Sequence, residues 1–183
     1  IECHKNNLVV SVDNPVPEDF TSHYDRKEQG LVVDYIIIMG YDEHYVGSDA
    51  GSVASLPWVE QGVQDTIAEV TPERTILAIP FYTRLWKTTG GAVTSEAIGM
   101  DEAQNVLSTN GVEAVWDGSV GQNYATFEQD NSTYQIWLED EQSIAEKVKL
   151  IQKYNLAGVA QWKLGFENSS IWQTISDNLQ AAS

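Results

Sequence analysis

The sequence predicts an α/β fold built on parallel strands, and three observations lead to this prediction. Apolar residues between the strand-like segments recur at intervals of three and four, as they do in amphipathic helices. Strand and helix signals alternate along the chain, which favours parallel strands joined by right-handed crossovers. Short apolar runs rich in β-branched residues are typical of buried parallel strands, and the chain has four of them: Leu8–Val12, Val32–Met39, Thr75–Phe81 and Ala157–Trp162.

The helical segments lie at residues 59–70, 141–154 and 171–179. Asp140 stands where the positive end of a helix dipole favours an acid, and Asn168 is expected to cap the closing helix. The segment Glu18–Gln29 gives a less clear signal, and Gly30 is expected to end any helix there.

A small α+β unit is predicted between the third strand and the next crossover helix. Gly99–Leu107 has the spacing of a short helix, and Gly111 would stop it. Three strand-like runs follow, separated by turn residues, and predict an antiparallel meander: Val112–Trp116, Asn123–Glu128 and Thr133–Leu138. The chain therefore divides into a first α/β part (1–86), an α+β insertion (87–139) and a last α/β part (140–183).

Composition excludes several classes of function. The formal net charge of −17 argues against binding to nucleic acid or to an anionic membrane surface, both of which require Lys and Arg. No apolar stretch approaches the roughly 20 residues that cross a bilayer. The lone Cys3 excludes an intramolecular disulfide and a multi-cysteine zinc site. An acidic surface is typical of a secreted or wall-associated protein, and a first residue Ile1 in place of Met indicates a boundary inside a longer protein.

Polar and aromatic side chains gather where all four predicted strands end, and the first of these ends supplies Ser11, Asp13 and Asn14. In parallel α/β folds, functional groups collect at the carboxyl ends of the strands, on one rim. Sugar rings stack on Trp and Tyr, and sugar hydroxyls bond to carboxylates and guanidinium groups. The sequence therefore predicts a saccharide-binding cleft. The residues concerned are Met39, Tyr41, Asp42, Tyr82, Arg84 and Trp162.

Each of these residues also has an ordinary structural interpretation. Asp42 could cap the helix or turn that follows its strand, Arg84 could be an ion-pair partner, and Trp162 could be part of the core. His44 stands beside Asp42 and Glu43, but three adjacent residues of an extended chain cannot all face one ion, so no metal site is predicted.

Three segments resemble glycoside hydrolase family 18. Residues 34–42, Asp-Tyr-Ile-Ile-Ile-Met-Gly-Tyr-Asp, are similar to the sixth barrel strand of that family, with its Met-x-Tyr-Asp ending. Residues 78–84, Ala-Ile-Pro-Phe-Tyr-Thr-Arg, resemble its seventh strand, usually Gly-x-Pro-x-Tyr-Gly-Arg, with Ala78 and Thr83 in place of the usual glycines. Residues 156–162, Leu-Ala-Gly-Val-Ala-Gln-Trp, resemble its eighth strand.

This resemblance implies the C-terminal half of a TIM (β/α)8 barrel, with barrel strands 5–8 and an insertion between the last two. It also implies an extracellular protein that acts at the cell wall or the spore, as members of a bacterial subgroup do. The implied reaction is retaining hydrolysis of a glycan containing N-acetylglucosamine, either chitin or peptidoglycan, assisted by the acetamido group of the substrate. No cofactor is implied.

The resemblance also assigns a role to each candidate residue. Tyr41 would hydrogen-bond the acetamido group, and Asp42 would bond the substrate near the cleavage point. Met39 and Tyr82 would line the pocket, Arg84 would bond sugar hydroxyls or orient a carboxylate, and Trp162 would stack under the sugar. The catalytic signature of the family, Asp-x-x-Asp-x-Asp-x-Glu, does not occur in the chain. We therefore expect the isolated chain to be inactive.

Two further expectations concern partners and alternatives. Four parallel strands leave open edges and an apolar face, which favours a homodimer formed through the open half-barrel. Two other functions remain open: a non-catalytic carbohydrate-binding protein of the same fold, and an α/β protein-interaction domain.

Overall fold

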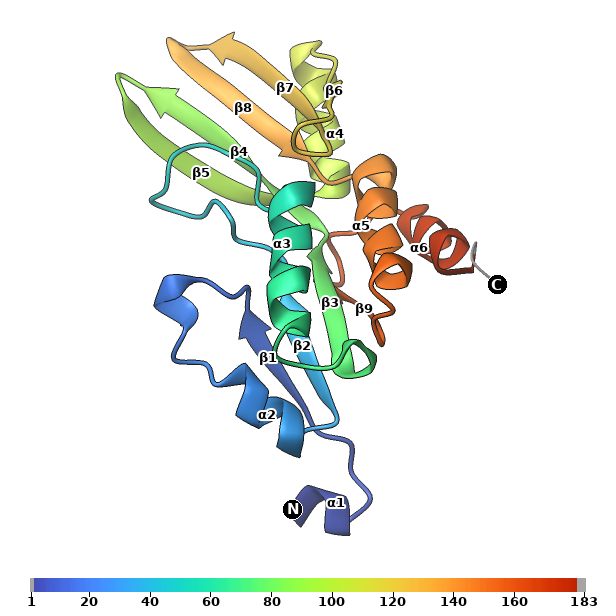
Figure 1. The fold of residues 1–183 in the computed structure, drawn as a ribbon. Coiled ribbons are helices and arrows are strands. Elements are labelled where there is room, and N and C mark those ends of the chain that lie inside the picture. The colour runs from blue at the N-terminus through green and yellow to red at the C-terminus, as the bar shows by residue number, and fades with distance from the viewer. Residues whose placement is uncertain (1, 181–183) are drawn as a thin grey trace.

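The computed structural model describes residues 2–180, and a four-stranded parallel sheet is its first layer (Figure 1). The strand order is β1 (Ser11–Pro15), β2 (Tyr35–Met39), β3 (Thr75–Pro80) and β9 (Gly158–Trp162). Ile37 in the middle of β2 pairs with Asp13 of β1 on one side and with Ile76 of β3 on the other. The predicted α/β fold with four parallel strands is confirmed.

Helices cover one face of this sheet (Figure 1). Helix α2 (Arg26–Val32) packs on β2, α3 (Leu56–Ile67) packs on β2 and β3, and α5 (Glu141–Lys153) packs on β3 and β9. Helix α6 (Ile171–Gln180) lies against α5, and the short, exposed α1 (Glu2–Lys5) precedes the sheet. None of the helices in residues 2–180 is long and apolar enough to cross a membrane.

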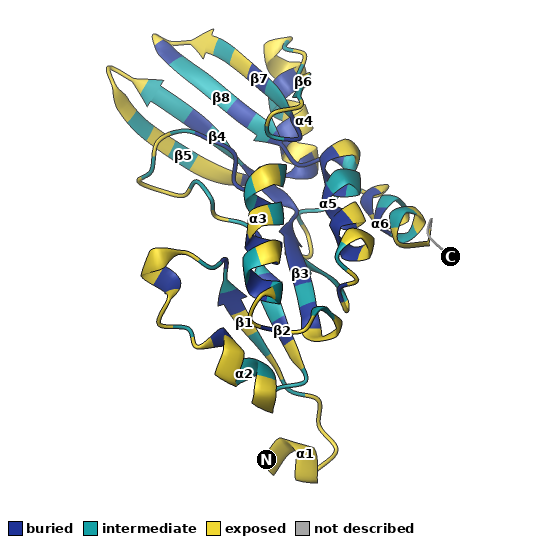
Figure 2. Ribbon diagram, in the orientation of Figure 1, coloured by how far each residue is buried: buried dark blue, intermediate teal, exposed yellow. Residues whose placement is uncertain are grey.

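The core lies between these helices and the sheet. Ile36 and Ile38 of β2 and Leu77 and Ile79 of β3 are almost completely buried. Because side chains alternate along a strand, the residues between them point to the opposite face, where Ile37 is only half-buried (Figure 2). In a closed barrel this face would line the interior, where side chains from the other strands would cover it. The half-barrel and the homodimer therefore remain predictions.

The second sheet is antiparallel and follows the carboxyl ends of the parallel strands (Figure 1). The elements of this part are β4 (Tyr82–Thr89), β5 (Ala92–Gly99), α4 (Met100–Asn110), β6 (Val115–Asp117), β7 (Gln122–Gln129) and β8 (Ser132–Leu138). The strand order of the sheet is β5-β4-β8-β7-β6. A second core lies between this sheet and helix α4 and includes Ile98, Ala103, Leu107 and Ile136.

Strand β1 lies three residues further along the chain than the predicted run Leu8–Val12. Leu8 and Val9 are 57% and 73% exposed, and pairing with β2 begins only at Ser11, opposite Tyr35. The apolar run indicated a buried strand, but a strand needs a neighbour, and β2 reaches no further back. Asp13 consequently lies within the strand and not after it.

The expectation that Gly30 ends a helix was wrong, because α2 continues through it to Val32. A Cβ added at Gly30 would lie 3.2 Å from both γ-carbons of Val70. A glycine inside a helix costs only about 1 kcal/mol relative to alanine. Its lack of a side chain here allows close packing of the helix.

The hairpin of β4 and β5 was not predicted, although the sequence contained its signal. Gly90 and Gly91 both have positive φ, 57° and 86°, as the tight turn between these strands requires. The segment after Arg84 alternates weakly, because two apolar residues are adjacent: Trp86 is buried, and Leu85 packs against the core of the second sheet. The second sheet therefore begins at Tyr82.

A buried polar network joins the second sheet to α5 and to the loop after β2. Lys147 Nζ lies 2.9 Å from both carboxylate oxygens of Glu139, and both side chains have no exposed surface. Gln122 Nε2 donates to Glu139 Oε1 at 2.8 Å, and Ser52 Oγ donates to Gln122 Oε1. Asp140 caps α5 by accepting bonds from the backbone N–H groups of its first turn, as its position predicted.

Candidate sugar-binding site

The turn after β2 places Tyr41 and Asp42 at the rim of the sheet. A Cβ on Gly40 would come within 2.9 Å of Leu77 and 3.0 Å of the Ala78 carbonyl oxygen, so the close approach of β2 and β3 requires glycine. Asp42 adopts φ 68°, in the left-handed region that a non-glycine residue rarely takes. Its Oδ1 accepts a hydrogen bond of 2.5 Å from the Tyr82 hydroxyl. Asp42 thus contacts a site residue and is not the cap of a helix.

The rest of the loop between β2 and α3, residues 43–55, is held by contacts to the second sheet and by contacts within the loop. The indole Nε1 of buried Trp86 donates to the Gly51 carbonyl oxygen at 2.8 Å. Glu43 accepts bonds from the backbone and hydroxyl of Ser55, and His44 Nδ1 lies 2.8 Å from the Ser52 carbonyl oxygen. Within residues 2–180, no three His, Cys, Asp or Glu side chains are grouped to hold a metal ion.

Arg84 lies on β4 of the second sheet and Trp162 at the end of β9 of the parallel sheet, and both line one hollow with Asp42. Arg84 Nη1 donates to Ser95 Oγ across the β4–β5 pair at 3.1 Å, and its buried Nε has no partner in the described chain. No carboxylate within residues 2–180 pairs with Arg84, so it is not an ordinary ion-pair residue. Trp162 ends β9 and is 54% exposed, so it is not core.

Three adjoining hollows run along this rim, and the six predicted residues line them. The central hollow, of about 110 Å³, is lined by Met39, Tyr41, Trp162 and their neighbours. The cationic hollow, of about 320 Å³, shares Trp162 with it. The aromatic hollow, of about 240 Å³, shares Met39 and Tyr41 with the central one. The cationic hollow is lined by Asp42, Tyr82, Arg84, Ala97, Trp162, Lys163 and Phe166.

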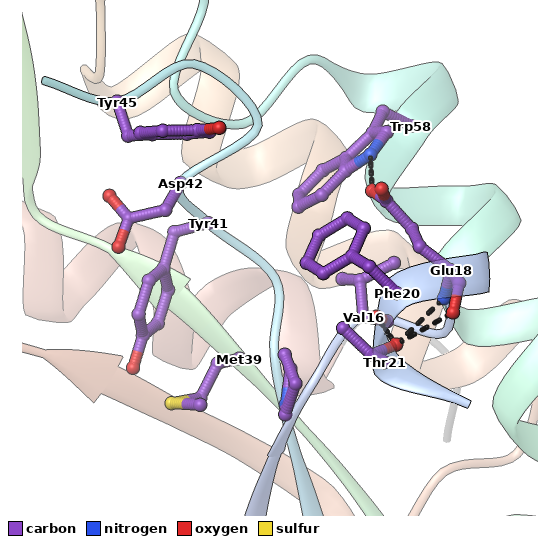
Figure 3. A pocket seen from close by; sticks show the side chains of 10 residues that line it. Val16, Glu18, Phe20, Thr21, Met39, Tyr41, Asp42, Tyr45 and Trp58 are labelled. Carbon is purple, nitrogen blue, oxygen red and sulfur yellow. Dashed lines mark hydrogen bonds between the residues drawn. The ribbon is translucent and has the colours of Figure 1, made fainter. Parts of the chain in front are cut away.

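The aromatic hollow extends the site toward β1 and α3 (Figure 3). The rings of Phe20 and Trp58 lie on one side, and Tyr41 and Met39 lie on the other (Figure 3). Trp58 Nε1 donates to Glu18 Oε1 at 3.0 Å, which fixes the orientation of the indole. The carboxylate of Asp42 points away from Phe20 and Trp58 (Figure 3). The flat apolar faces of this hollow suit a sugar ring, while the Asp42 carboxylate is turned toward Tyr82 and the cationic hollow.

Both site tyrosines are held in the protonated form. Burial, with the nearby charges of Asp13 and Asp42, raises the pKa of Tyr41 to about 12. Burial, together with the hydrogen bond that Tyr82 donates to Asp42, raises the pKa of Tyr82 above its usual range. The ring centroids of the two residues lie 6.2 Å apart, with one edge toward the other face. The raised pKa keeps the Tyr41 hydroxyl a hydrogen-bond donor well into alkaline pH.

The raised pKa of Tyr41 predicts a loss of stability at alkaline pH. The unfolded chain gives up this proton near pH 10 and the folded chain only near pH 12. Unfolding therefore releases a proton between these values, and the free energy of unfolding falls as pH rises through this window. Chemical unfolding at stepped alkaline pH should give a shallower decline for Tyr41→Phe than for the original chain. Tyr35→Phe, at the other end of β2, controls for loss of a phenol, and an unchanged slope in Tyr41→Phe would contradict the assignment.

Other residues of the site were not assigned roles from the sequence. Asp13 and Gln161 line the central hollow, and both were visible only as polar residues near strand ends. Tyr45 and Trp58 line the aromatic hollow from a loop and from α3. No local spacing relates Trp58 to Glu18, 40 positions earlier. These contacts arise only in the tertiary fold, and no residue spacing in the sequence predicts them.

The fold and the rim together define a parallel α/β protein with a sugar-compatible cleft at the carboxyl ends of its strands. The family model of the glycosyl hydrolases family 18 matches residues 2–167. This match covers most of the chain, so the chain belongs to that family.

Individual relatives agree with the family assignment. The chain is 26% identical over 159 residues to the glycosylase YvbX of Bacillus subtilis, covering 86% of this chain and 46% of the relative. It is 24% identical over 157 residues to a cortical fragment-lytic enzyme of the same species, covering 84% and 36%. The chain thus spans less than half the length of both.

A solved structure shows the same fold. The chitinase of Chromobacterium violaceum superposes with a TM-score of 0.89 at 24% identity, covering 97% of this chain and 57% of that one. At this identity the likeness concerns the fold alone.

Proposed function

We propose that this chain forms the sugar-binding half of a glycoside hydrolase barrel that acts on glycans containing N-acetylglucosamine. One observation carries the proposal: Tyr41, Asp42, Tyr82, Arg84 and Trp162 come from three strand ends and line adjoining hollows on one rim. Membership of the glycosyl hydrolases family 18 supports it. The four parallel strands would be strands 5–8 of the complete barrel, with their uncovered face turned to its interior.

Each side chain has a role that fits its surroundings. Tyr41, kept protonated by its raised pKa, would donate to the acetamido oxygen of the sugar, while Asp42 would accept from substrate near the cleavage point. The half-exposed Trp162 would stack on the ring face. Arg84 would bond sugar hydroxyls, and Met39 and Tyr82 would line the pocket.

This arrangement supports retaining hydrolysis assisted by the substrate. The acetamido oxygen would attack the anomeric carbon and take the place of a second enzyme carboxylate. That attack requires the acetamido group to be fixed beside the reacting carbon, and orientation of this kind lowers a barrier by several kcal/mol. The hydrogen bond between Tyr82 and Asp42 holds the carboxylate ready without an added counter-ion. Protonation of the leaving oxygen needs an acid that we assign to a segment outside this sequence.

The relatives and the charge of the chain support a proposed site of action. A cortical fragment-lytic enzyme is among them, and the chain is strongly acidic, with a formal net charge of −17. We place its action at the cell wall or the spore, outside the cytoplasm. Both chitin and peptidoglycan contain the acetamido sugar that this mechanism requires.

Titration with N-acetylglucosamine oligomers tests the proposal. Backbone and side-chain NMR signals of Tyr41, Tyr82 and Trp162 should shift together as one binding site fills. Trp162→Ala should weaken binding about 30-fold or more, since a stacked aromatic anchor commonly contributes about 2 kcal/mol or more. Trp172→Ala, which removes a partly exposed indole from α6, is the matched control and should bind normally. Absence of any response at the three residues would refute the proposal and favour an α/β interaction domain.

A further inference from the structure

The cationic hollow has a charge pattern that binding of a neutral sugar does not require. Arg84 and Lys163 both line it, and Asp42 is the one carboxylate among its lining residues in the described chain. Two cations and one carboxylate leave one positive charge. The chain as a whole carries 27 acidic and only 10 basic side chains, so two cations at one hollow oppose the general trend.

Neither cation is neutralised by the surrounding protein. Within residues 2–180, neither Arg84 nor Lys163 has a carboxylate within ion-pair distance. Lys163 Nζ lies 4.5 Å from the centre of the Phe166 ring, a contact that positions the ammonium without satisfying its hydrogen bonds. Arg84 donates to Ser95 through one nitrogen, and its buried Nε is unpaired.

Apart from Asp42, the acidic side chains beside Phe166 line a separate hollow. Asp101, Glu102 and Glu167 line a neighbouring depression that shares only Phe166 with the cationic hollow. Glu167 Oε2 accepts a hydrogen bond of 2.6 Å from the backbone N–H of Gly165. The carboxylate of Asp42 is engaged by the Tyr82 hydroxyl. The single negative charge of Asp42 offsets only one of the two positive charges of Arg84 and Lys163, so one of them stays available to a ligand.

We propose that the cationic hollow is a subsite for a saccharide unit carrying a carboxylate, of which the lactyl ether of N-acetylmuramic acid is the example in peptidoglycan. Trp162 and Phe166 supply apolar faces for the ring, and Arg84 and Lys163 bind the carboxylate. This inference rests on the proposed function and deepens it: the site then prefers peptidoglycan glycan to chitin, whose repeating unit has no carboxylate. A guanidinium forms paired hydrogen bonds with a carboxylate, whereas a hydroxyl offers no charge to match it.

The test compares three tetrasaccharides by calorimetry and NMR with the 183-residue chain. The first alternates N-acetylglucosamine and N-acetylmuramic acid without peptide. The second is the same molecule with each lactyl carboxylate converted to a methyl amide, and the third is the N-acetylglucosamine tetramer. The first should bind roughly two- to five-fold more tightly than the second, which is the range of an exposed charge pair. The difference should shrink in about 0.5 M salt, where exposed charges are screened.

Substitutions distinguish binding of the carboxylate by Lys163 from an effect of the net charge of the chain. Lys163→Ala should abolish the preference for the carboxylate, and Lys163→Glu should reverse it. Lys27→Ala removes an equal charge from the exposed surface of α2 and should leave the preference intact. Equal binding of the acid and its amide, or an equal loss for both in Lys163→Ala, would overturn the inference while leaving the sugar site in place. If none of the three oligosaccharides binds, the proposed function fails together with it.

Discussion

Lys147→Met is expected to lower the free energy of unfolding by about 3–5 kcal/mol, because it leaves the buried carboxylate of Glu139 without its cation. Lys147 Nζ contacts both oxygens of Glu139 at 2.9 Å, and neither side chain reaches solvent. A methionine can fill the space of the lysine stem, but it cannot compensate the charge. The loss corresponds to a fall of roughly 6–20 °C in the melting midpoint of a chain of this size.

Two further variants show whether the charge or the packing is responsible. Lys149→Met, two residues further along α5, breaks an exposed pair with Glu146 and should cost at most about 1 kcal/mol. Adding Glu139→Gln to Lys147→Met removes the stranded charge and keeps one side-chain oxygen that can accept from Gln122, while the new amide nitrogen can donate to the Ser143 hydroxyl. This double variant should recover most of the lost stability. A single variant as stable as the original chain would show that the pair contributes nothing.

The defect of Lys147→Met should also depend on pH. Burial raises the pKa of Glu139, and the charge of Lys147 is the main influence that opposes this rise. Without the lysine, the folded-state pKa rises further above the unfolded value of 4.5. A raised carboxyl pKa destabilises the folded state at pH values above the unfolded pKa and ceases to do so as pH falls toward it. The difference in unfolding free energy between the variant and the original chain should therefore shrink from neutral pH toward about pH 4.5.

This network also connects stability to the proposed sugar site. Gln122 and Ser52 continue it from Glu139 into the loop that begins at Asp42. The loop has no regular secondary structure between β2 and α3, so such contacts are what hold its backbone. The second sheet therefore does more than extend the molecule: it fixes the segment that carries Asp42 and Tyr45.

Local signals in the sequence were enough to predict the parallel sheet and the closing helices. The apolar runs that became β2, β3 and β9 are short and bounded by polar residues, so their carboxyl ends could be located. Because function collects at these ends in parallel folds, the candidate residues Tyr41, Asp42 and Trp162 followed from strand positions alone. The resemblance to a known family then gave each residue a proposed role.

Contacts between distant segments could not be predicted in the same way. Ser52 meets Gln122 across 70 positions, and Lys163 gains its place beside Arg84 only when β9 and β4 come together. The predicted bounds of β1 were wrong, because an apolar run shows where a strand can form but not which residues will pair with a neighbouring strand. The pattern of residues in the sequence also does not predict whether Lys163 faces the site or solvent.

The 183-residue chain is expected to bind N-acetylglucosamine oligomers but not to cleave them. The Asp-x-x-Asp-x-Asp-x-Glu segment that would supply the acid is absent from its sequence, and general acid catalysis contributes roughly 10²–10⁴-fold to rate. Two of the carboxylates in the cleft have other partners, since Asp42 accepts from Tyr82 and Glu18 accepts from Trp58. Product analysis by mass spectrometry, after long incubation of purified chain with the N-acetylglucosamine tetramer, should find no shortened oligomers.

Binding measured on the same sample makes this negative result informative. If the tetramer shifts the signals of Tyr41 and Trp162 and still survives intact, the chain positions substrate without providing the proton. Turnover that persists in chain purified by two independent routes would contradict the expectation, and Asp42→Asn and Asp13→Asn would then identify the acid. Positioning and protonation are physically separable in this mechanism, because the acetamido nucleophile belongs to the substrate and the leaving oxygen must still be protonated from elsewhere. A half-barrel that binds without cutting is the outcome this separation predicts.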